Sequence, residues 1–325
     1  MKIIFCGTPE YAVPSLRRLA RLPGHDLVAV VSQPDRPQGR SRTPVSPPVV
    51  NAARDLGLSA ERILQPRSIN EKAILQKLKE LSPDLLCVIA FGQLLKQGAL
   101  ALPRLFALNA HGSLLPKFRG AAPIQAALLA GERETGVTIM KIELGLDKGP
   151  CLLNRKLAIA PSDDAGSLHD KLAELSAESF AEALAAVEAG HCAFTPQEES
   201  AATYAAKLTK ESGRMDWKLE ATGLECFIRA MNPWPGAWTT VHAPGGKPRR
   251  VRLAACAVSS PPETLASVGA GCVAATGAEA GIIVRCGSGA LLLRRLQPEG
   301  GREMSAAEFL RGAGKDFSSA EMRWE

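Results

Sequence analysis

The fold is constrained most by a regular alternation of short apolar runs and amphipathic helical patterns over the first 190 residues. The apolar runs are continuous rather than alternating, which is typical of strands buried on both faces. A parallel sheet with helices on each side buries its strands in this way. We therefore predict a Rossmann-like α/β domain with a parallel sheet over residues 1–190. The strand patterns are residues 2–7, 26–33, 84–92, 105–111 and 136–142, and the helical patterns are residues 11–22, 70–81, 123–131 and 167–190.

The pattern changes after residue 190. Residues 191–206 lose the helical periodicity, and we predict that they form a linker. Over residues 207–325, short strand patterns are separated by Gly and Pro turns, and almost no helix is expected. Such a region is typical of a small β-barrel or sandwich, and we predict an OB-like C-terminal β-barrel domain. Its strand patterns are residues 236–243, 249–258, 270–275 and 280–298.

The overall composition is that of a soluble globular protein. A chain of 325 residues suits two domains, and 46% of its residues are hydrophobic while 22% are charged. No stretch approaches 18 continuous apolar residues, which a membrane span would require. The first residues, MKIIFCG, enter a strand pattern at once and lack the features of a signal peptide. We therefore expect a cytoplasmic protein.

The cysteines and the charges give weaker indications. Eight cysteines are scattered along the chain without a C-x-x-C pair, so buried reduced thiols are favoured over disulfides or a zinc site. No metal is expected. The formal net charge is +6, and from Lys207 onward there are 16 Lys and Arg residues against 12 Asp and Glu residues. This basic C-terminal region favours an anionic partner.

The turn after the first predicted strand disfavours a dinucleotide-dependent dehydrogenase. Such enzymes carry a G-x-G-x-x-G sequence there, whereas this chain has Gly7 followed by Thr8, Pro9 and Glu10. Pro9 lacks an N–H group for a phosphate, and Glu10 adds a negative charge at the same place.

Three polar side chains are candidates for a catalytic site. Asn109 and His111 lie two residues apart at the end of a predicted strand, so both point to the side of the sheet where ligands bind. Asp147 lies in a Gly-flanked loop after the next strand, which we expect at the same edge. A capping Asn, a buried structural His and a turn Asp are the plainer interpretations.

Together, however, an amide, an imidazole and a carboxylate suit acyl transfer to an amine. The amide and imidazole can stabilise a developing oxyanion, and the carboxylate can orient the imidazole and assist proton transfer. No recognisable nucleophilic Ser or Cys motif accompanies them, so direct attack by a substrate amine is simpler than a covalent enzyme intermediate.

Longer motifs extend this interpretation. The chain resembles the folate-dependent formyltransferases, and within that family it is most similar to members that act on an aminoacylated tRNA. The resemblance rests on N-x-H at residues 109–111, GSLLP at 112–116, RGAAPIQ at 119–125, ETGVTIM at 134–140 and GLDKG at 145–149. It continues in residues 3–12, 32–40, 215–217 and 232–238, and so covers essentially the whole chain.

The resemblance implies transfer of the formyl group of 10-formyltetrahydrofolate to the amino group of methionine on initiator tRNA, without a metal and by a monomer. The family's catalytic residues match Asn109, His111 and Asp147. Its folate-contacting residues match Ser113, Leu114, Leu115 and Pro116, with the apolar residues 90–95 beside them. Arg40 and Arg42 are candidates for RNA contact, or simply two solvated loop arginines. Pro150 departs from the family pattern, in which an acidic residue is expected.

Two other functions stay open at this point. A formyltransferase of the same superfamily could act on a sugar-nucleotide amine, although the basic C-terminal region disfavours this mildly. A non-catalytic RNA-binding protein is disfavoured by the intact set of Asn109, His111 and Asp147. A glycinamide ribonucleotide substrate is disfavoured because the Gly-rich phosphate loop is missing after the first strand.

Overall fold

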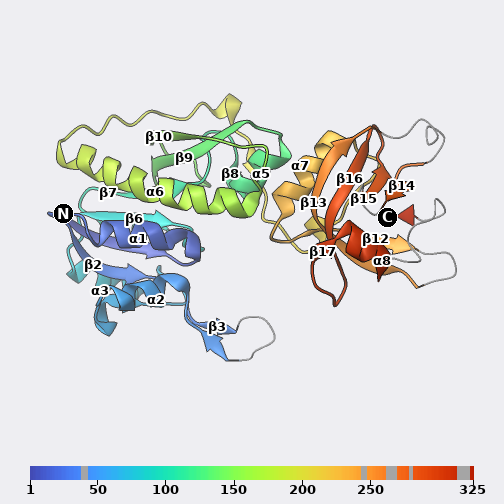
Figure 1. The fold of residues 1–325 in the computed structure, drawn as a ribbon. Helices are drawn as coiled ribbons and strands as arrows, with labels where there is room; N and C mark the ends of the chain where they lie inside the picture. Colours follow the sequence, from blue (N-terminus) through green and yellow to red (C-terminus); the bar gives the residue numbers. More distant parts are fainter. Residues whose placement is uncertain (38–42, 243–246, 261–268, 278–280, 313–322) are drawn as a thin grey trace. The chain divides into compact units, whose positions relative to one another are not determined.

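The computed structural model describes residues 1–37, 43–242, 247–260, 269–277, 281–312 and 323–325 (Figure 1). The chain divides into two compact units. The first comprises Met1–Pro123, Glu134–Ile159 and Leu168–Ala205, and the second comprises Ile124–Arg133, Ala160–Ser167 and Ala206–Glu325. The second unit thus takes in two short segments from the first 190 residues. Whether the chain separates into independent domains near residues 191–206 stays a prediction.

The first unit is built on a seven-stranded sheet in the order β10-β9-β7-β6-β1-β2-β5. Neighbouring strands are parallel from β7 to β5, which confirms the predicted mainly parallel sheet. Strand β9 differs from the prediction because it is antiparallel to β7, and β10, which is antiparallel to β9, was not among the predicted strands. The strands are β1 (Lys2–Gly7), β2 (Asp26–Val31), β5 (Ile63–Leu64), β6 (Leu85–Ile89), β7 (Phe106–His111), β9 (Glu134–Lys141) and β10 (Cys151–Ala158).

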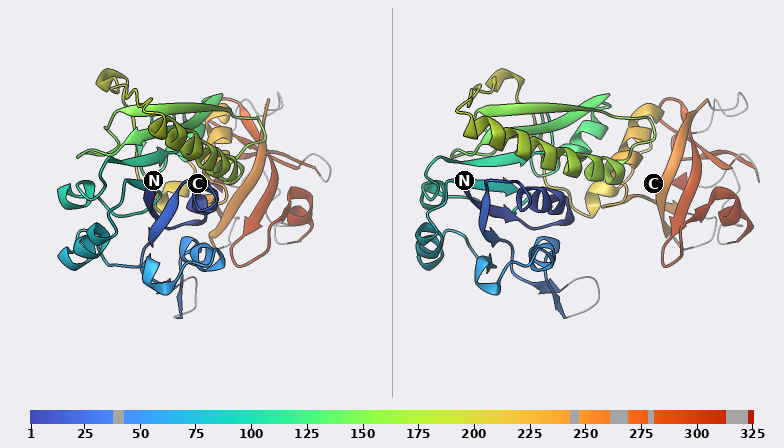
Figure 2. Two further views of the ribbon diagram at one scale, coloured as in Figure 1. Left: turned by 90° about the vertical axis from the view of Figure 1, so that its left-hand side faces the viewer. Right: turned by 60° about the vertical axis from the view of Figure 1, so that its left-hand side comes forward.

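Helices cover both faces of this sheet. One face packs Ile4, Cys6 and Val88 against Leu78 and Ala99 from two helices, α3 and α4. On the other face, α1 and α6 lie side by side (Figures 1 and 2). This two-sided cover explains why β6 is buried along its whole length. The helices of this unit are α1 (Val13–Leu19), α2 (Pro48–Asp55), α3 (Lys72–Glu80), α4 (Gln97–Leu100) and most of α6 (Ala165–Glu188), with short 3₁₀ helices at Glu10–Ala12 and Ala60–Arg62. Helix α5 (Pro123–Leu129) falls, apart from Pro123, in the second unit.

The segment predicted to be a linker is attached to the first unit. Thr195 pairs with Cys151, and β11 (Tyr204–Ala205) forms a parallel pair with β8 (Arg119–Gly120). A 3₁₀ turn at Glu199–Ala201 lies between these contacts. A further hairpin is formed by β3 (Arg36–Pro37) and β4 (Pro44–Val45). Residues 191–206 therefore reach the end of β7, where the candidate catalytic side chains lie.

The second unit is an antiparallel sheet in the order β14-β15-β16-β13-β12-β18, with β17 paired to β16. The Trp324 N–H donates to the carbonyl of Gly271, just before β14, so the sheet curls until its two ends meet. This agrees with the predicted small barrel. The strands are β12 (Ala237–His242), β13 (Arg249–Ser259), β14 (Val273–Gly277), β15 (Gly281–Arg285), β16 (Ala290–Pro298), β17 (Met304–Ser305) and β18 (Arg323–Trp324).

Two helices of the second unit were not predicted. They are α7 (Ala221–Met231), which packs against β13, and α8 (Ala306–Arg311). Ser305 caps α8 by accepting from the Glu308 N–H, while the Glu308 carboxylate accepts from the Ser305 N–H. Across the described part of the chain, no helix combines the length and apolar character that a membrane crossing would need.

Candidate active site

The site is built around the end of β7. Asn109 lies opposite Val88 of β6 and Met140 of β9, and His111 lies opposite Thr138 of β9. The two side chains share one face of the strand because they are two residues apart. His111 is only 6% exposed, while Asn109 is partly exposed. Among the described residues, the Asn109 amide has no hydrogen-bond partner. It is therefore available to a ligand.

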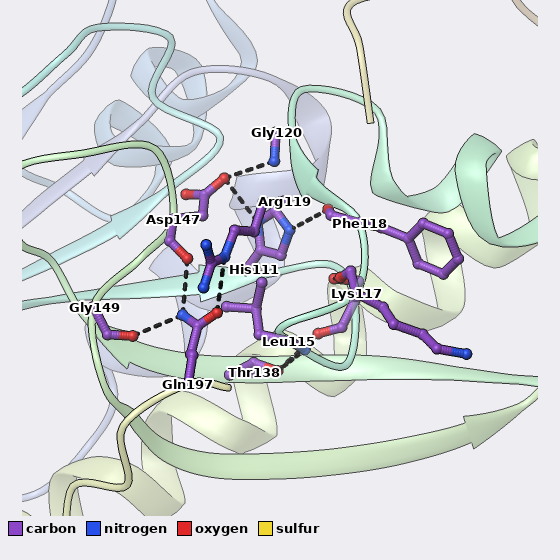
Figure 3. Close-up of polar contacts among 11 residues, drawn as sticks. His111, Leu115, Lys117, Phe118, Arg119, Gly120, Thr138, Asp147, Gly149 and Gln197 are labelled. Carbon is purple, nitrogen blue, oxygen red and sulfur yellow. Dashed lines mark hydrogen bonds and ion pairs between the residues drawn. The ribbon is translucent and has the colours of Figure 1, made fainter. Parts of the chain in front are cut away.

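His111 is held between two acceptors. Its Nε2 lies 2.9 Å from the carbonyl oxygen of Phe118, and its Nδ1 lies 3.7 Å from Oδ2 of Asp147 (Figure 3). A neutral imidazole carries one N–H, so donation from Nε2 to Phe118 leaves Nδ1 unprotonated beside the carboxylate. Nδ1 is then the ring nitrogen that can accept a proton, and the carboxylate would stabilise the resulting positive charge.

Asp147 reaches His111 by a different route from the one expected. The sequence suggested the end of another parallel strand, but β9 is antiparallel and ends beside Leu108 at Lys141. The loop of residues 142–150 turns back toward His111, with Gly145 at φ +120° and Asp147 itself at φ +50°. Oδ2 of Asp147 accepts the Gly120 N–H at 2.8 Å. The loop ends at Pro150, whose carbonyl oxygen accepts the Lys141 N–H.

A buried arginine lies behind Asp147. Arg119 is 0% exposed and forms two hydrogen bonds with Glu199, at 2.9 and 3.1 Å. Hydrogen bonding to Glu199 raises the pKa of Arg119, and the same contact lowers the pKa of Glu199. Arg119 Nε also donates to Gln197 Oε1 at 3.0 Å, and Gln197 Nε2 donates to the carbonyls of Asp147 and Gly149.

Sequence reasoning did not single out Arg119 or Gln197. Arg119 stood only inside the RGAAPIQ motif, and Gln197 lay in the predicted linker. The one available signal was that Arg119 is followed by the small residues Gly120, Ala121 and Ala122.

The predicted folate loop, residues 113–116, is held in place by hydrogen bonds within the protein. The Ser113 hydroxyl donates to the Lys117 carbonyl at 2.6 Å. Thr138 Oγ1 accepts the Leu115 N–H and donates to the Ser113 carbonyl, and the Leu115–Pro116 peptide bond is cis. Ser113 and Leu115 are buried, so their side chains belong to the protein interior. Leu114 and Pro116 are partly exposed and are the two that present surface to a ligand.

Residues 90–95 lie at the same edge of the sheet. The carbonyl oxygens of Phe91 and Gly92 accept hydrogen bonds from Gln33 Nε2, and Phe91 also accepts from the Thr8 hydroxyl. These contacts join the loops that follow β1, β2 and β6. Leu94 leaves 69% of its surface exposed beside them.

Arg40 and Arg42 lie outside the described residues, so the structure places neither of them. The hairpin of β3 and β4 flanks them on both sides. Within the described ranges, no three His, Cys, Asp or Glu side chains gather in a way that could hold a metal ion.

Comparison with known families accounts for both parts of the chain. Residues 1–184 match the model of the formyl transferase family, and residues 207–314 match the model of the formyl transferase C-terminal domain. The chain belongs to the formyl transferase family. It is 42% identical over 312 residues to the methionyl-tRNA formyltransferase of Geobacter metallireducens, with 96% of each chain covered. It is 45% identical over 311 residues to that of Stenotrophomonas maltophilia, covering 95% of this chain and 97% of the other.

Several solved structures share the fold. A sugar 3N-formyl transferase, WlaRD, superposes with a TM-score of 0.63 at 16% identity, covering 92% of this chain and 97% of the other. HypX from Aquifex aeolicus in complex with tetrahydrofolic acid gives a TM-score of 0.59 at 20% identity, covering 97% of this chain and 48% of the other. Methionyl-tRNA formyltransferase from Clostridium thermocellum gives 0.53 at 13% identity, covering 80% and 94%.

Proposed function

We propose that this chain transfers the formyl group of 10-formyltetrahydrofolate to the amino group of methionyl-initiator tRNA, and so serves translation initiation. The observation that carries the proposal is the similarity to methionyl-tRNA formyltransferases, at 42% and 45% identity along essentially the whole chain. The grouping of His111 and Asp147, with Asn109 on the same strand face, supports it independently.

Asn109 has the features of an oxyanion donor. Its amide is partly exposed and has no partner in the described structure, so it can donate to the formyl oxygen as negative charge develops there. When bound, 10-formyltetrahydrofolate supplies the formyl carbon, which gains a bond to the methionyl nitrogen and loses its bond to N10.

His111 acts as the general base and then as the general acid. Free α-amino groups titrate near 7.7–8.0, so a substantial fraction of the attacking amine is neutral at mildly alkaline pH. As the new C–N bond forms, Nδ1 of His111 takes the proton from that nitrogen, and the Asp147 carboxylate at 3.7 Å stabilises the imidazolium. The same proton then neutralises the departing N10, so that His111 returns to its starting state.

The loop of residues 113–116 fits a flat, largely apolar ligand. The partly exposed Leu114 and Pro116, in the loop that follows His111, offer apolar surface, and the exposed Leu94 offers more in the loop that follows β6. Nearby carbonyl oxygens can each accept a second hydrogen bond from a polar ring edge. We therefore propose that these residues wall the pterin, while Ser113 and Leu115 shape the loop from inside.

The second substrate is a large polyanion, and the basic C-terminal region from Lys207 onward is suited to it. Arg40 and Arg42 are proposed to contact the RNA, although they lie outside the described residues. The enzyme would act as a monomer in the cytoplasm, where aminoacyl-tRNA is made and used.

The proposal is tested by incubating the full chain with 10-formyltetrahydrofolate and methionyl-initiator tRNA, then measuring N-formylmethionine after deacylation. A parallel reaction offers a nucleotide-linked amino sugar, and a third offers free methionine. Formylation of the tRNA alone is expected. Formylation of the sugar without the tRNA would replace the proposal by the sugar-nucleotide function, and tRNA binding without any transfer would replace it by a binding function.

A further inference from the structure

We propose that Arg119 and Gln197 act as a positioning pair, which holds the loop of Asp147 so that its carboxylate faces His111. The inference rests on the proposed function, because it concerns the same reaction, but it assigns a role to two residues outside the Asn109, His111 and Asp147 set. Within the described structure, neither residue is hydrogen-bonded to His111; Arg119 binds Gln197, and Gln197 binds the Asp147 carbonyl (Figure 3).

The loop has few other supports. Residues 143–146 and Lys148 are exposed, including Leu144 at 66% and Leu146 at 53%. Within the described structure, hydrogen bonds to residues 143–148 come only from Gln197, to the Asp147 carbonyl, and from the Gly120 N–H, to its carboxylate. Asp147 also adopts φ +50°, in the left-handed region, which is uncommon outside glycine although Asp adopts it more readily than most residues. Its position therefore depends on these two hydrogen bonds, together with the ion pair between Lys148 and Glu199 at 3.7 Å and the contact of Asp147 with His111.

Gln197 can be oriented in only one way. Arg119 has only donors, so the atom of Gln197 that faces Arg119 Nε at 3.0 Å must be the oxygen. The amide nitrogen must then face the loop, where its two hydrogens reach the carbonyls of Asp147 at 2.8 Å and Gly149 at 2.7 Å. A turned carboxamide would place oxygen against two carbonyl oxygens and NH₂ against a guanidinium group. Arg119 thus sets which way Gln197 binds the loop.

Arg119 is itself fixed by burial and charge. It is 0% exposed, and its two terminal nitrogens bind the Glu199 carboxylate as a planar fork. The following residue, Gly120, supplies the N–H that binds the Asp147 carboxylate at 2.8 Å. Asp147 is therefore held on its carbonyl side through the Arg119 side chain and on its carboxylate side by the next residue of the same strand, β8.

The variant that tests the pair is Gln197→Leu, which has a similar size but no hydrogen-bonding groups. We expect kcat for tRNA formylation to fall about 10²-fold, the usual effect of displacing a catalytic group by about 1 Å. The KM values for 10-formyltetrahydrofolate and for the tRNA should change less than threefold or so, because neither proposed binding surface is altered. Glu198→Gln is the matched control: Glu198 is the exposed neighbour of Gln197, within the described structure its carboxylate accepts a hydrogen bond from Ser200 and not from the loop, and the variant should keep near-normal kcat.

A double-mutant comparison separates positioning from a general loss of structure. In an Asp147→Asn background, Gln197→Leu should cost about nothing further in kcat, because the group through which it acts is already lost. Losses that multiply, or unchanged kcat in Gln197→Leu, would overturn the inference while the wild-type chain still formylates methionyl-tRNA. A wild-type chain that fails to formylate the tRNA would instead contradict the proposed function.

Discussion

At the scale of single residues, the chemistry of the site depends on which hydrogen-bonding groups of its side chains already have partners within the protein. Phe118 occupies Nε2 of His111, and Gly120 occupies one carboxylate oxygen of Asp147, whereas the Asn109 amide has no partner in the described structure. The remaining groups are therefore a donor on Asn109, an acceptor on His111 and a charge on Asp147. Acyl transfer to an amine requires this combination.

The first prediction concerns Asn109. Asn109→Ala should lower kcat by about 10²–10³, the usual effect of removing an oxyanion donor, while folate binding stays near normal. Single-turnover formylation measures the chemical step, and equilibrium titration with the folate measures binding. Near-normal turnover would contradict the role assigned to the amide.

The second prediction concerns how the three groups combine. His111→Ala and Asp147→Ala should each be comparably severe, and the double variant should be little worse than either alone, because the carboxylate acts through the imidazole at 3.7 Å. The measurement is kcat/KM for the single and double variants. Effects that multiply would mean that the two residues act independently.

The sequence indicated the three reacting groups but not the residues that hold them. Asn109 and His111 follow from strand alternation, which is a local rule. Arg119 and Gln197 meet across 78 positions in the chain, and neither has a spacing that predicts the contact. Whether a buried arginine is satisfied by a distant glutamine depends on tertiary packing, which composition and periodicity do not encode.

At the scale of elements, the short pair of β8 and β11 connects the segment of residues 191–206 to the site. Gly120 of β8 lies at φ +116°, and a Cβ there would come within 2.5 Å of the Ala205 carbonyl oxygen in β11. No side chain fits without separating the two strands. The same residue donates to Asp147, so this pairing and the catalytic loop are joined at one backbone position.

The third prediction follows from this contact. Gly120→Ala should destabilise the fold by about 2–4 kcal/mol, through backbone strain and the lost pairing, and should also lower kcat because Asp147 loses its N–H donor. Gly57→Ala is the matched control: Gly57 has φ +79° but nothing within 4 Å of a new Cβ. It should cost about 1–2 kcal/mol and leave kcat unchanged. Chemical denaturation and steady-state rates measure both, and equal effects of the two variants would contradict the argument.

The direction of β9 could not be predicted from its sequence pattern, although its burial could. Its continuous apolar pattern predicted a buried strand correctly, and β9 is buried over most of its length. Burial on both faces is compatible with either direction, however, because the same residues are covered whichever way the strand runs. In the second unit, α7 was missed because its eleven residues contain Thr, Gly and Cys, which weaken a helical pattern.

At the scale of the whole molecule, buried acidic protons make stability sensitive to alkaline pH. Burial raises the pKa of Tyr11 to about 12, and it raises the pKa of the Cys87 thiol to about 12 as well. Between the ordinary pKa values and these raised ones, the unfolded chain loses protons that the folded chain keeps. Rising pH therefore favours unfolding across this interval.

The fourth prediction isolates one of these groups. Tyr11 should contribute a loss of stability that approaches about 3 kcal/mol above pH 12, with about half of it present by pH 11. Tyr11→Phe removes the hydrogen bond to Ser176, so it should be about 1 kcal/mol less stable at pH 8, yet its stability should fall less steeply above pH 10. Urea unfolding at several pH values measures both slopes. Parallel slopes would mean that Tyr11 ionises equally in both states.

Two arginines of β13 differ in their contacts within the protein. Arg252 donates to the Asn232 side chain at 3.0 Å and to the Pro233 carbonyl at 2.6 Å, so it stabilises the turn before β12. Arg250 is exposed and lies over the Trp238 ring, with its guanidinium carbon 3.5 Å from the ring centroid. When a guanidinium ion stacks on an aromatic ring, its face contacts the ring and the N–H groups at its edge point away from it. These N–H groups can then donate to a phosphate.

The last prediction uses this difference to test the polyanionic partner. Arg250→Ala should weaken tRNA binding and reduce the slope of log affinity against log salt by about 1, because one phosphate contact fewer releases one counterion fewer. Arg252→Ala should instead lower the stability of the turn, since its hydrogen bonds are internal. Binding is measured at several salt concentrations and stability by thermal unfolding, with the folate affinity as a check on the first unit. An unchanged salt slope in Arg250→Ala, with a changed slope in Arg252→Ala, would reverse the assignment of these two arginines. If neither slope changed, the surface that binds tRNA would have to lie elsewhere.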